Sequence, residues 1–172
     1  MSAAPVIIVM GVAGAGKSTV AEELARRFGC AFADADEFHA AANIAKMRAG
    51  IPLDDGDRHS WLLAIAARVD SWRAGGVGGI IACSALKRAY RRIISGGRPD
   101  VVLVYLRGDP AMIRRRLSER RHHFMPASLL DSQFETLEEP AADEHPIVLD
   151  AAKSAPELVT EILHALRALG AR

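Results

Sequence analysis

The chain has 172 residues, a length that predicts one domain (residues 1–172) able to bury a core without disulfide bonds. Lys and Arg number 22 and Asp and Glu 21, so the formal net charge of +1 creates no overall field that would attract nucleic acid or an anionic membrane. The two cysteines, Cys30 and Cys83, are too few for a disulfide framework and lack metal-ligand spacing, which favours a reducing, cytoplasmic setting.

Five short apolar runs along the chain predict strands. The first, Val6 to Met10, has no basic residue before it and is too short to span a bilayer, so we expect no targeting or membrane segment. Its β-branched residues show no alternation, which is typical of a strand buried on both faces of a parallel sheet. Similar runs lie at Gly79 to Cys83, Val101 to Leu106 and Ile147 to Leu149, with a shorter one at Cys30 to Ala33.

The first run leads directly into the segment Gly11-Val12-Ala13-Gly14-Ala15-Gly16-Lys17-Ser18, followed by Thr19. It matches G-x-x-x-x-G-K-[ST] at every fixed position between a predicted strand and a predicted helix, a context that argues against an accidental glycine-rich turn. Glycines let successive N–H groups point at phosphate oxygens, and the helix adds its positive N-terminal dipole. We therefore expect residues 11–19 to bind ATP, with Lys17 at the β- and γ-phosphates and Ser18 as a ligand of Mg²⁺.

Apolar residues at helical spacing lie between the predicted strands. The clearest sets are Val20, Leu24, Ala25 and Phe28, then Trp61, Leu62, Ile65 and Val69, and later Leu158, Ile162, Leu166 and Leu169. Gly29, Gly75 and Gly170 stand where helix C-caps are expected. The alternation of strands and helices predicts an α/β fold, a parallel five-stranded sheet flanked by helices, with ligands at the carboxyl ends of the strands.

Two carboxylates, Asp34 and Asp36, follow the second predicted strand, from where they can reach over the phosphate loop. We expect Asp34 to hold the metal through water and Asp36 to orient the acceptor hydroxyl or receive its proton, because phosphoryl transfer depends on positioning and charge neutralisation. The alternative is that Asp36 is the N-cap of a helix beginning at Glu37.

With these residues in view, the chain resembles the gluconate kinases of the small P-loop kinase group over nearly its whole length. The resemblance runs through Gly11 to Thr19, Asp34 to His39, Asn43-Ile44, Lys46-Met47, Gly50 to Asp55, Asp57-Arg58, Trp61-Leu62, Ala82 to Lys87, Tyr90-Arg91, Tyr105-Leu106, Gly108-Asp109, His123 to Pro126, Leu129-Leu130, Ser132 to Glu138 and Pro140. It implies a P-loop NTPase fold with a helical lid, similar to shikimate kinase and nucleoside monophosphate kinases. It also implies transfer of phosphoryl from ATP to the 6-hydroxyl of D-gluconate, a homodimer, and an adenine loop at Leu149 to Lys153.

A gluconate pocket needs cations for the carboxylate and several hydrogen-bonding groups for the hydroxyls. Arg58, in a turn-rich segment before a predicted helix, is the leading candidate for the carboxylate clamp. The alternative for Arg58 is an exposed ion pair with Asp54 or Asp55, which contributes little. His39, one helical turn from Asp36, is a further candidate, although a lone histidine is more often structural.

Ser84 and Lys87 follow the third predicted strand, Gly79 to Cys83, at its carboxyl end. A cation near a helix N-terminus is locally unfavourable, which suggests an anionic ligand for Lys87. Capping by Ser84 with Lys87 in solvent is the alternative. Cys83 beside them is expected to be a small core residue and not a nucleophile.

A segment rich in arginine and histidine, approximately residues 114–128, predicts the lid. Asp109-Pro110 suits a helix start, which places Arg116 and Arg120 on one face at i and i+4. Their planar guanidinium groups suit bidentate phosphate binding and neutralisation of the transferred group, whereas the alternative is a solvated basic face. His122 and His123 are assigned to the lid without a metal role, because neighbouring side chains diverge on a helix and Mg²⁺ prefers oxygen ligands.

Three other functions remain open from the residues. Shikimate kinase shares the phosphate loop and the two spaced carboxylates, but it expects a glycine triplet where this chain has Cys83-Ser84-Ala85. Nucleoside monophosphate kinases share the loop and the arginine-rich lid, but their base-binding segments are not found. A nucleotide-binding switch or regulatory module, which needs no acceptor, is the alternative from a different class.

Overall fold

A parallel sheet of five strands forms the centre of the computed structural model, which describes residues 5–120 and 127–170. The strands lie in the order β2-β3-β1-β4-β5, and each neighbouring pair is parallel. Their bounds are β1 (Val6–Met10), β2 (Ala31–Asp34), β3 (Gly79–Ala82), β4 (Val101–Arg107) and β5 (Ile147–Asp150). The prediction of a parallel, five-stranded α/β fold is confirmed.

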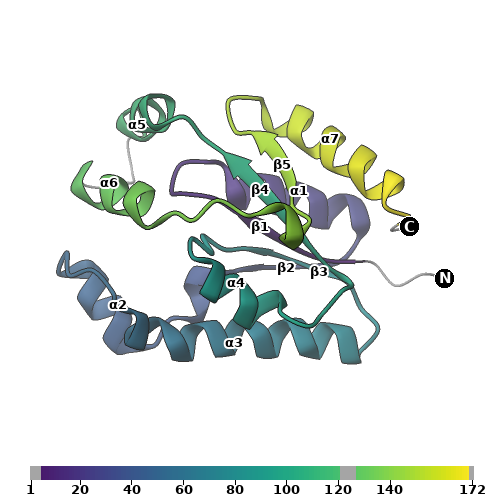
Figure 1. The fold of residues 1–172 in the computed structure, drawn as a ribbon, viewed down its shortest axis with the longest axis horizontal. Helices are drawn as coiled ribbons and strands as arrows, with labels where there is room; N and C mark the ends of the chain where they lie inside the picture. The colour runs from purple at the N-terminus through teal and green to yellow at the C-terminus, as the bar shows by residue number, and fades with distance from the viewer. Residues whose placement is uncertain (1–4, 121–126, 171–172) are drawn as a thin grey trace.

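Helices cover both faces of this sheet, as Figure 1 shows. One face carries α1 (Lys17–Phe28) and α7 (Ala155–Ala168), and the other carries α3 (Asp55–Ala74) and α4 (Arg88–Ser95). Along β1, Ile7 and Val9 belong to the core under α1 and α7, whereas Ile8 and Met10 belong to the core under α3 and α4. Because both faces are covered, the ends of the strands are the places left for polar chemistry.

The remaining elements gather at the end of the sheet where the strands finish, to the left in Figure 1. They are the short 3-10 helix η1 (Ala35–Phe38), α2 (Ala41–Arg48), α5 (Pro110–Ser118) and α6 (Ala127–Thr136). This end of the sheet therefore carries the phosphate loop together with the helices that surround it. A second 3-10 helix, η2 (Ala142–Glu144), lies at the other end of the sheet, where it leads into the start of β5. Within the ranges that the structure describes, no helix is both long and apolar enough to cross a bilayer.

Several boundaries differ by a residue or two from those predicted. The second strand runs to Asp34 and not to Ala33, which places this carboxylate in the last position of β2. Gly29 adopts the left-handed conformation (φ 63°) and caps α1, as predicted. Leu169 was predicted on the buried face of the last helix, but it lies beyond the end of α7 and is 64% exposed.

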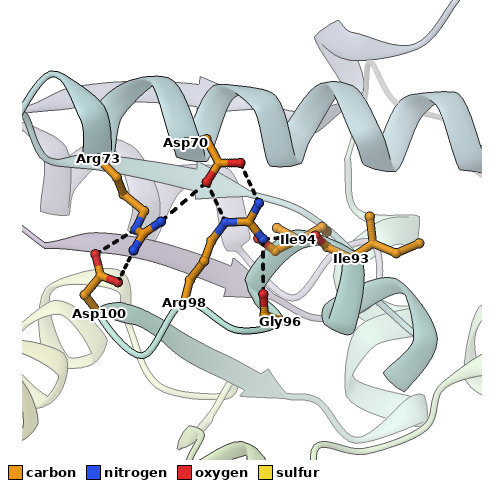
Figure 2. Close-up of polar contacts among 7 residues, drawn as sticks. All are labelled: Asp70, Arg73, Ile93, Ile94, Gly96, Arg98 and Asp100. Atoms are coloured by element: carbon orange, nitrogen blue, oxygen red, sulfur yellow. Dashed lines mark hydrogen bonds and ion pairs between the residues drawn. The ribbon is translucent and has the colours of Figure 1, made fainter.

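At the opposite end of the sheet, Arg98 ties the turn after α4 to helix α3 (Figure 2). Its guanidinium donates to both carboxylate oxygens of Asp70, at 2.7 and 2.6 Å. The same group donates to main-chain carbonyls at the C-terminal end of α4, those of Ile93, Ile94 and Gly96, at 3.3 to 3.4 Å. These carbonyls have no partner within the helix, so Arg98 stabilises the end of α4 through its charge and its hydrogen bonds.

Arg73 extends this network to β4, as Figure 2 also shows. It donates to both oxygens of Asp100 at 2.8 Å and approaches Asp70 at 3.5 Å. Hydrogen bonds from Arg98 hold the pKa of Asp70 below its ordinary value. The network fixes α3 and the α4–β4 turn far from the phosphate loop, so its role is in the framework and not in the chemistry.

We expect Gly79→Ala to destabilise the fold by about 1–3 kcal/mol, because the added methyl group at the start of β3 would collide with the ring of Trp72 on α3. Urea denaturation measures the effect. Gly75→Ala is the matched control: this residue has helical dihedral angles (φ −78°), and the new methyl group meets only ordinary contacts. The control should lose no more than about 0.5 kcal/mol. Equal stability of the Gly79 variant and the wild type would contradict the tight packing of α3 on β3.

Candidate active site

The phosphate loop, residues 11–18, takes a conformation that requires glycine at three positions. Gly11, Gly14 and Gly16 have φ of 152°, 81° and 93°, a region that other residues rarely adopt. A Cβ atom at Gly11 would lie 2.8 Å from the carbonyl oxygen of Leu106, and one at Gly14 would lie 2.9 Å from Cγ of Leu117. The loop thus folds closely against β4 and α5, and it ends at Gly16, the N-cap of α1.

Lys17 extends from the first turn of α1 back under this loop. Its Nζ donates to the carbonyl of Val12 at 2.9 Å, and its side chain lines a cavity at the carboxyl edge of the sheet. Burial lowers the pKa of Lys17, although the carboxylates of Asp36 and Asp34 act in the opposite direction. An ammonium group held at this place is suited to the charge of a polyphosphate.

Ser18 and Asp34 form a pair of oxygen groups beside Lys17. Ser18 Oγ donates to Asp34 Oδ2 at 2.9 Å, and Asp34 Oδ1 accepts from the main-chain N–H of Asp36 at 3.0 Å. No group of three His, Cys, Asp or Glu side chains suited to a metal occurs in residues 5–120 and 127–170. The pair fits Mg²⁺ nonetheless, since this ion is commonly held by one or two carboxylates, water and substrate phosphates.

Asp36 stands on the same cavity wall, on η1. Asp34, and not Asp36, caps η1, so the predicted alternative that Asp36 is merely an N-cap is wrong. Although the residue is open to the cavity, partial burial followed by the charge of Asp34 raises the pKa of Asp36, while Lys17 and His39 oppose this change. A carboxylate with a raised pKa is a better proton acceptor than an ordinary one.

His39 lies flat against Trp61 of α3, with ring centroids 4.5 Å apart and an angle of 9° between the planes. Trp61 is itself fixed, because its Nε1 donates to the carbonyl of Ala35 at 2.6 Å. Burial lowers the pKa of His39, Asp36 raises it, and Arg58 lowers it further. Its Nδ1 is buried and finds no hydrogen-bond partner in the part of the chain that the structure describes. Buried polar atoms are normally paired, so this nitrogen is an exception that calls for a functional explanation.

Arg58 and Lys87, predicted separately, meet around the buried ring of Tyr90. Arg58 donates to the Tyr90 hydroxyl at 3.2 Å, and the Tyr90 hydroxyl donates to Asp55. Lys87 Nζ donates to the two oxygens of Asp55 at 3.0 and 3.2 Å. Both cations also lie over the ring, 5.7 and 5.5 Å from its centroid. Asp54 caps α3, so Arg58 has neither of the direct pairs proposed as its alternative.

The two arginines of the predicted lid occupy different environments. Arg116 donates to the carbonyl of Gly14 at 3.3 Å and to that of Ala151, after β5, at 2.8 Å. Arg120 lines the cavity, but it lies beyond the end of α5 at Ser118. The prediction that they share a helix face is therefore wrong, because the helix ends between them. His122 and His123, with the central part of the predicted lid, lie outside the described residues.

A cavity of about 890 Å³ brings together the predicted residues Lys17, Ser18, Asp34, Asp36 and Arg120, whereas His39, Arg58, Lys87 and Arg116 do not line it. Four further residues on its wall are Arg48, Ser84, Leu129 and Gln133. Ser84 is not the cap of α4, since that position belongs to Lys87. Cys83 is fully buried beside Lys17, and burial raises the pKa of its thiol to about 12, which fits the predicted core role.

Sequence reasoning missed Arg48, Gln133 and the link through Tyr90 and Asp55. Tyr90 and Gln133 stood within the segments that resemble gluconate kinases, but no chemical pattern assigned either of them a role. The nearest signal was the concentration of acidic residues around Asp55, which suggested a partner for Arg58.

The protein has a P-loop kinase fold. This class is defined by a parallel sheet that carries, at its carboxyl edge, the phosphate loop, a partly buried lysine and two carboxylates. A family model described as an AAA domain matches residues 6–140. The probable gluconokinase of Xenopus tropicalis is 42% identical over 172 residues, covering 91% of this chain and 90% of that protein. The thermoresistant gluconokinase of Escherichia coli is 42% identical over 144 residues, covering 84% and 82%.

Solved structures agree with these relatives. A gluconokinase from Sinorhizobium meliloti superposes with a TM-score of 0.87 at 40% identity, covering 96% of this chain and 93% of that one. Shikimate kinase from Aquifex aeolicus reaches a TM-score of 0.59 at 17% identity, covering 95% and 97%, which is a likeness of fold alone. The chain belongs to the gluconokinase family.

We expect the fluorescence of Trp61 to fall as His39 takes up a proton, with a midpoint below pH 6.5, because a stacked imidazolium quenches indole and burial lowers the pKa of this histidine. Since the folded-state pKa lies below the unfolded one, the stability contributed by neutral His39 is lost as the pH falls through it. A pH titration of tryptophan emission measures the midpoint. His39→Asn is the control and should lack the step; a midpoint at or above pH 6.5 would contradict the stacked, neutral imidazole.

Proposed function

We propose that this protein is a gluconokinase that transfers the γ-phosphoryl group of ATP to the 6-hydroxyl of D-gluconate, giving 6-phosphogluconate and ADP. The observation that carries the proposal is a line of polar groups that begins on the cavity wall at Asp36, passes His39, whose pKa responds to the charges of Asp36 and Arg58, and ends at Arg58 and Lys87 around Tyr90. Such a line offers a proton acceptor at one end and cations at the other, which suits a polyhydroxy carboxylate. Relatives named gluconokinase, about 42% identical over most of the chain, support the same acceptor.

The donor side rests on residues 11–19 with Lys17 and Arg120. ATP supplies the phosphoryl group and Mg²⁺ supplies charge neutralisation between its phosphates. Lys17 holds the phosphate end through a cation that is already positioned by the carbonyl of Val12. Ser18 and Asp34 provide the oxygen groups for the metal, Asp34 acting through water.

The acceptor side begins at Asp36, which orients the 6-hydroxyl and receives its proton. His39 and Ser84 hydrogen-bond the hydroxyls of the sugar chain, His39 with the nitrogen that has no partner in the described structure. Arg58 and Lys87 bind the carboxylate end. They are connected through Tyr90 and Asp55, so the anion would join an existing charged cluster, replacing part of the contact between Lys87 and Asp55.

In this proposal the lid, residues 114–128, excludes water from the reacting groups. Arg120 neutralises the charge that spreads over the transferred phosphoryl group. Arg116 takes a different part: it joins the phosphate loop to the loop after β5, where the adenine would lie. A fixed Arg116 keeps these two nucleotide-binding segments at a constant separation.

The cellular setting is part of the same proposal. We propose a cytoplasmic, single-domain enzyme that acts as a homodimer on a small molecule and binds neither nucleic acid nor membrane. The net charge of +1 and the two unpaired cysteines support the setting, and the family resemblance supports the dimer.

We expect ADP release in the presence of ATP and Mg²⁺ to rise by at least 100-fold on addition of D-gluconate, because a bound acceptor hydroxyl replaces water as the nucleophile. Shikimate and nucleoside monophosphates, measured in parallel, should leave the rate near the level seen without an acceptor. A coupled assay for ADP measures all four. Slow hydrolysis that D-gluconate does not stimulate would overturn the proposal and favour a nucleotide-binding module.

We expect Arg58→Ala to raise the KM for D-gluconate by about 10- to 100-fold, since a hydrogen bond to a charged group contributes about 1.5–3 kcal/mol. The KM for ATP should be unchanged. Arg68→Ala removes an exposed arginine from the same helix and is the matched control, expected to retain wild-type kinetics. Lys17→Ala should instead lower kcat on the order of 10²–10³-fold. An unchanged KM for gluconate in the Arg58 variant would remove Arg58 from the carboxylate site.

A further inference from the structure

One peptide group of the phosphate loop, between Val12 and Ala13, is held at both ends. Its carbonyl oxygen accepts from Lys17 Nζ at 2.9 Å. Its N–H, which belongs to Ala13, donates to Oε1 of Gln133 on α6 at 2.7 Å. Gln133, which lies 120 positions further along the chain, is therefore bound to the same peptide group as Lys17. Lys17 is expected to contact the phosphates, so this part of the loop is the phosphate end.

The hydrogen bond from Ala13 determines how the Gln133 amide is oriented. A main-chain N–H can donate only to the oxygen of the side-chain amide, so Oε1 points toward Ala13 and the –NH₂ group points away from it. Within residues 5–120 and 127–170, Nε2 of Gln133 donates to no protein group, and it is not among the buried atoms without a partner. Gln133 lines the same cavity as Lys17 and Arg120. Two N–H donors thus remain for whatever occupies the phosphate end of this cavity.

A purely structural role for Gln133 would be to attach α6 to the loop. Helix α6 has other attachments, however. Leu130 is buried in the core shared with α1 and α7, and Asp131 forms an ion pair with Arg114 of α5. Just after the helix, the N–H of Glu138 donates to the carbonyl of Leu86 at 2.8 Å. The helix is held in place without Gln133, so the amide is a positioned donor on a fixed element.

We propose that Gln133 contacts the terminal phosphoryl group of the bound nucleotide, donating from Nε2 while Oε1 stays on Ala13. This assignment rests on the proposed kinase function. During transfer the acceptor oxygen forms a bond to phosphorus, the bond from phosphorus to the β,γ-bridging oxygen breaks, and the hydroxyl proton passes to Asp36. Gln133 gains and loses no proton. It supplies a neutral hydrogen bond to the phosphoryl oxygens, on the side of the peptide opposite Lys17.

Two variants separate this role from simple attachment. Gln133→Glu keeps an oxygen for the Ala13 N–H but replaces the donor with a negatively charged oxygen, whereas Gln133→Met keeps the length and loses both functions. We expect kcat with gluconate to fall roughly 10- to 100-fold in the Met variant, as for a lost hydrogen bond to a charged group, and further in the Glu variant. Glu135→Gln changes the charge of α6 by one unit at an exposed position outside the lid and should retain wild-type kcat.

Nucleotide affinity gives a second readout that needs no acceptor. By isothermal titration calorimetry, both variants should bind a non-hydrolysable ATP analogue at least 10-fold more weakly than wild type, while ADP affinity stays within about threefold. Equal losses for ADP and the analogue would overturn the proposal, because the effect would then lie in the loop as a whole. So would a Glu variant that keeps wild-type kcat while the Met variant loses it, since attachment to Ala13 would then suffice.

The two proposals fail separately. If gluconate does not stimulate the wild-type protein, the gluconokinase function is wrong, yet the ratio of analogue to ADP affinity still decides the role of Gln133. If gluconate stimulates and both variants match the wild type, only the role of Gln133 is lost. Should the Met variant fail to fold, the Glu variant alone decides, because it preserves the contact that joins α6 to the loop.

Discussion

A partly buried ammonium group, Lys17, is the constraint on which the site depends. Removing a cation from water is costly unless neighbouring groups compensate, and here the carbonyl of Val12 and the carboxylates of Asp34 and Asp36 do so. Each of these partners is placed by a different element: the glycine conformations of the loop, the end of β2, and η1. Burial, followed by the charge of Asp34, raises the pKa of Asp36 and suits it to accept a proton. The groups that offset the charge of Lys17 are therefore the same groups that can bind a metal and accept a proton at this edge of the sheet.

The proposed acceptor side repeats this arrangement, with cations that are again offset by a carboxylate. Arg58 and Lys87 are like charges that meet at one ring, and Asp55 together with the Tyr90 hydroxyl makes their approach possible. Tyr90 is buried on α4 and Arg58 lies on α3, so the packing of these two helices sets the geometry of the cations. At the far end of the same helices, the Arg98 network joins α3 to the turn after α4 and belongs to the framework.

The sequence predicted the fold and the nucleotide-binding half of the site because both depend on patterns of residues that are close together in the chain. Apolar runs without alternation mark buried parallel strands, and a loop of eight residues carries its own phosphate chemistry. Asp34, Asp36 and Ser84 could be placed because a strand end is a local feature. Arg120 was misplaced because the end of α5 at Ser118 has no glycine or proline to mark it. The roles of Tyr90, Gln133 and Arg116 depend on contacts between residues 32 to 120 positions apart, which no local spacing reveals.

Two of those long-range contacts, made by Arg116 and Gln133, hold the phosphate loop against α5 and α6. Ile113 and Leu117 of α5 pack where Gly14 leaves no room for a side chain, Arg116 binds the Gly14 carbonyl, and Gln133 of α6 binds the Ala13 N–H. The conformation of the phosphate loop, residues 11–18, thus depends on contacts with α5 and α6, which come much later in the chain. The predicted lid, residues 114–128, overlaps the end of α5 and the start of α6, so a movement of these helices would act on the peptide groups of the loop. Helices α5 and α6 are thus linked to the phosphate loop by hydrogen bonds between the side chains of Arg116 and Gln133 and the main chain of Gly14 and Ala13.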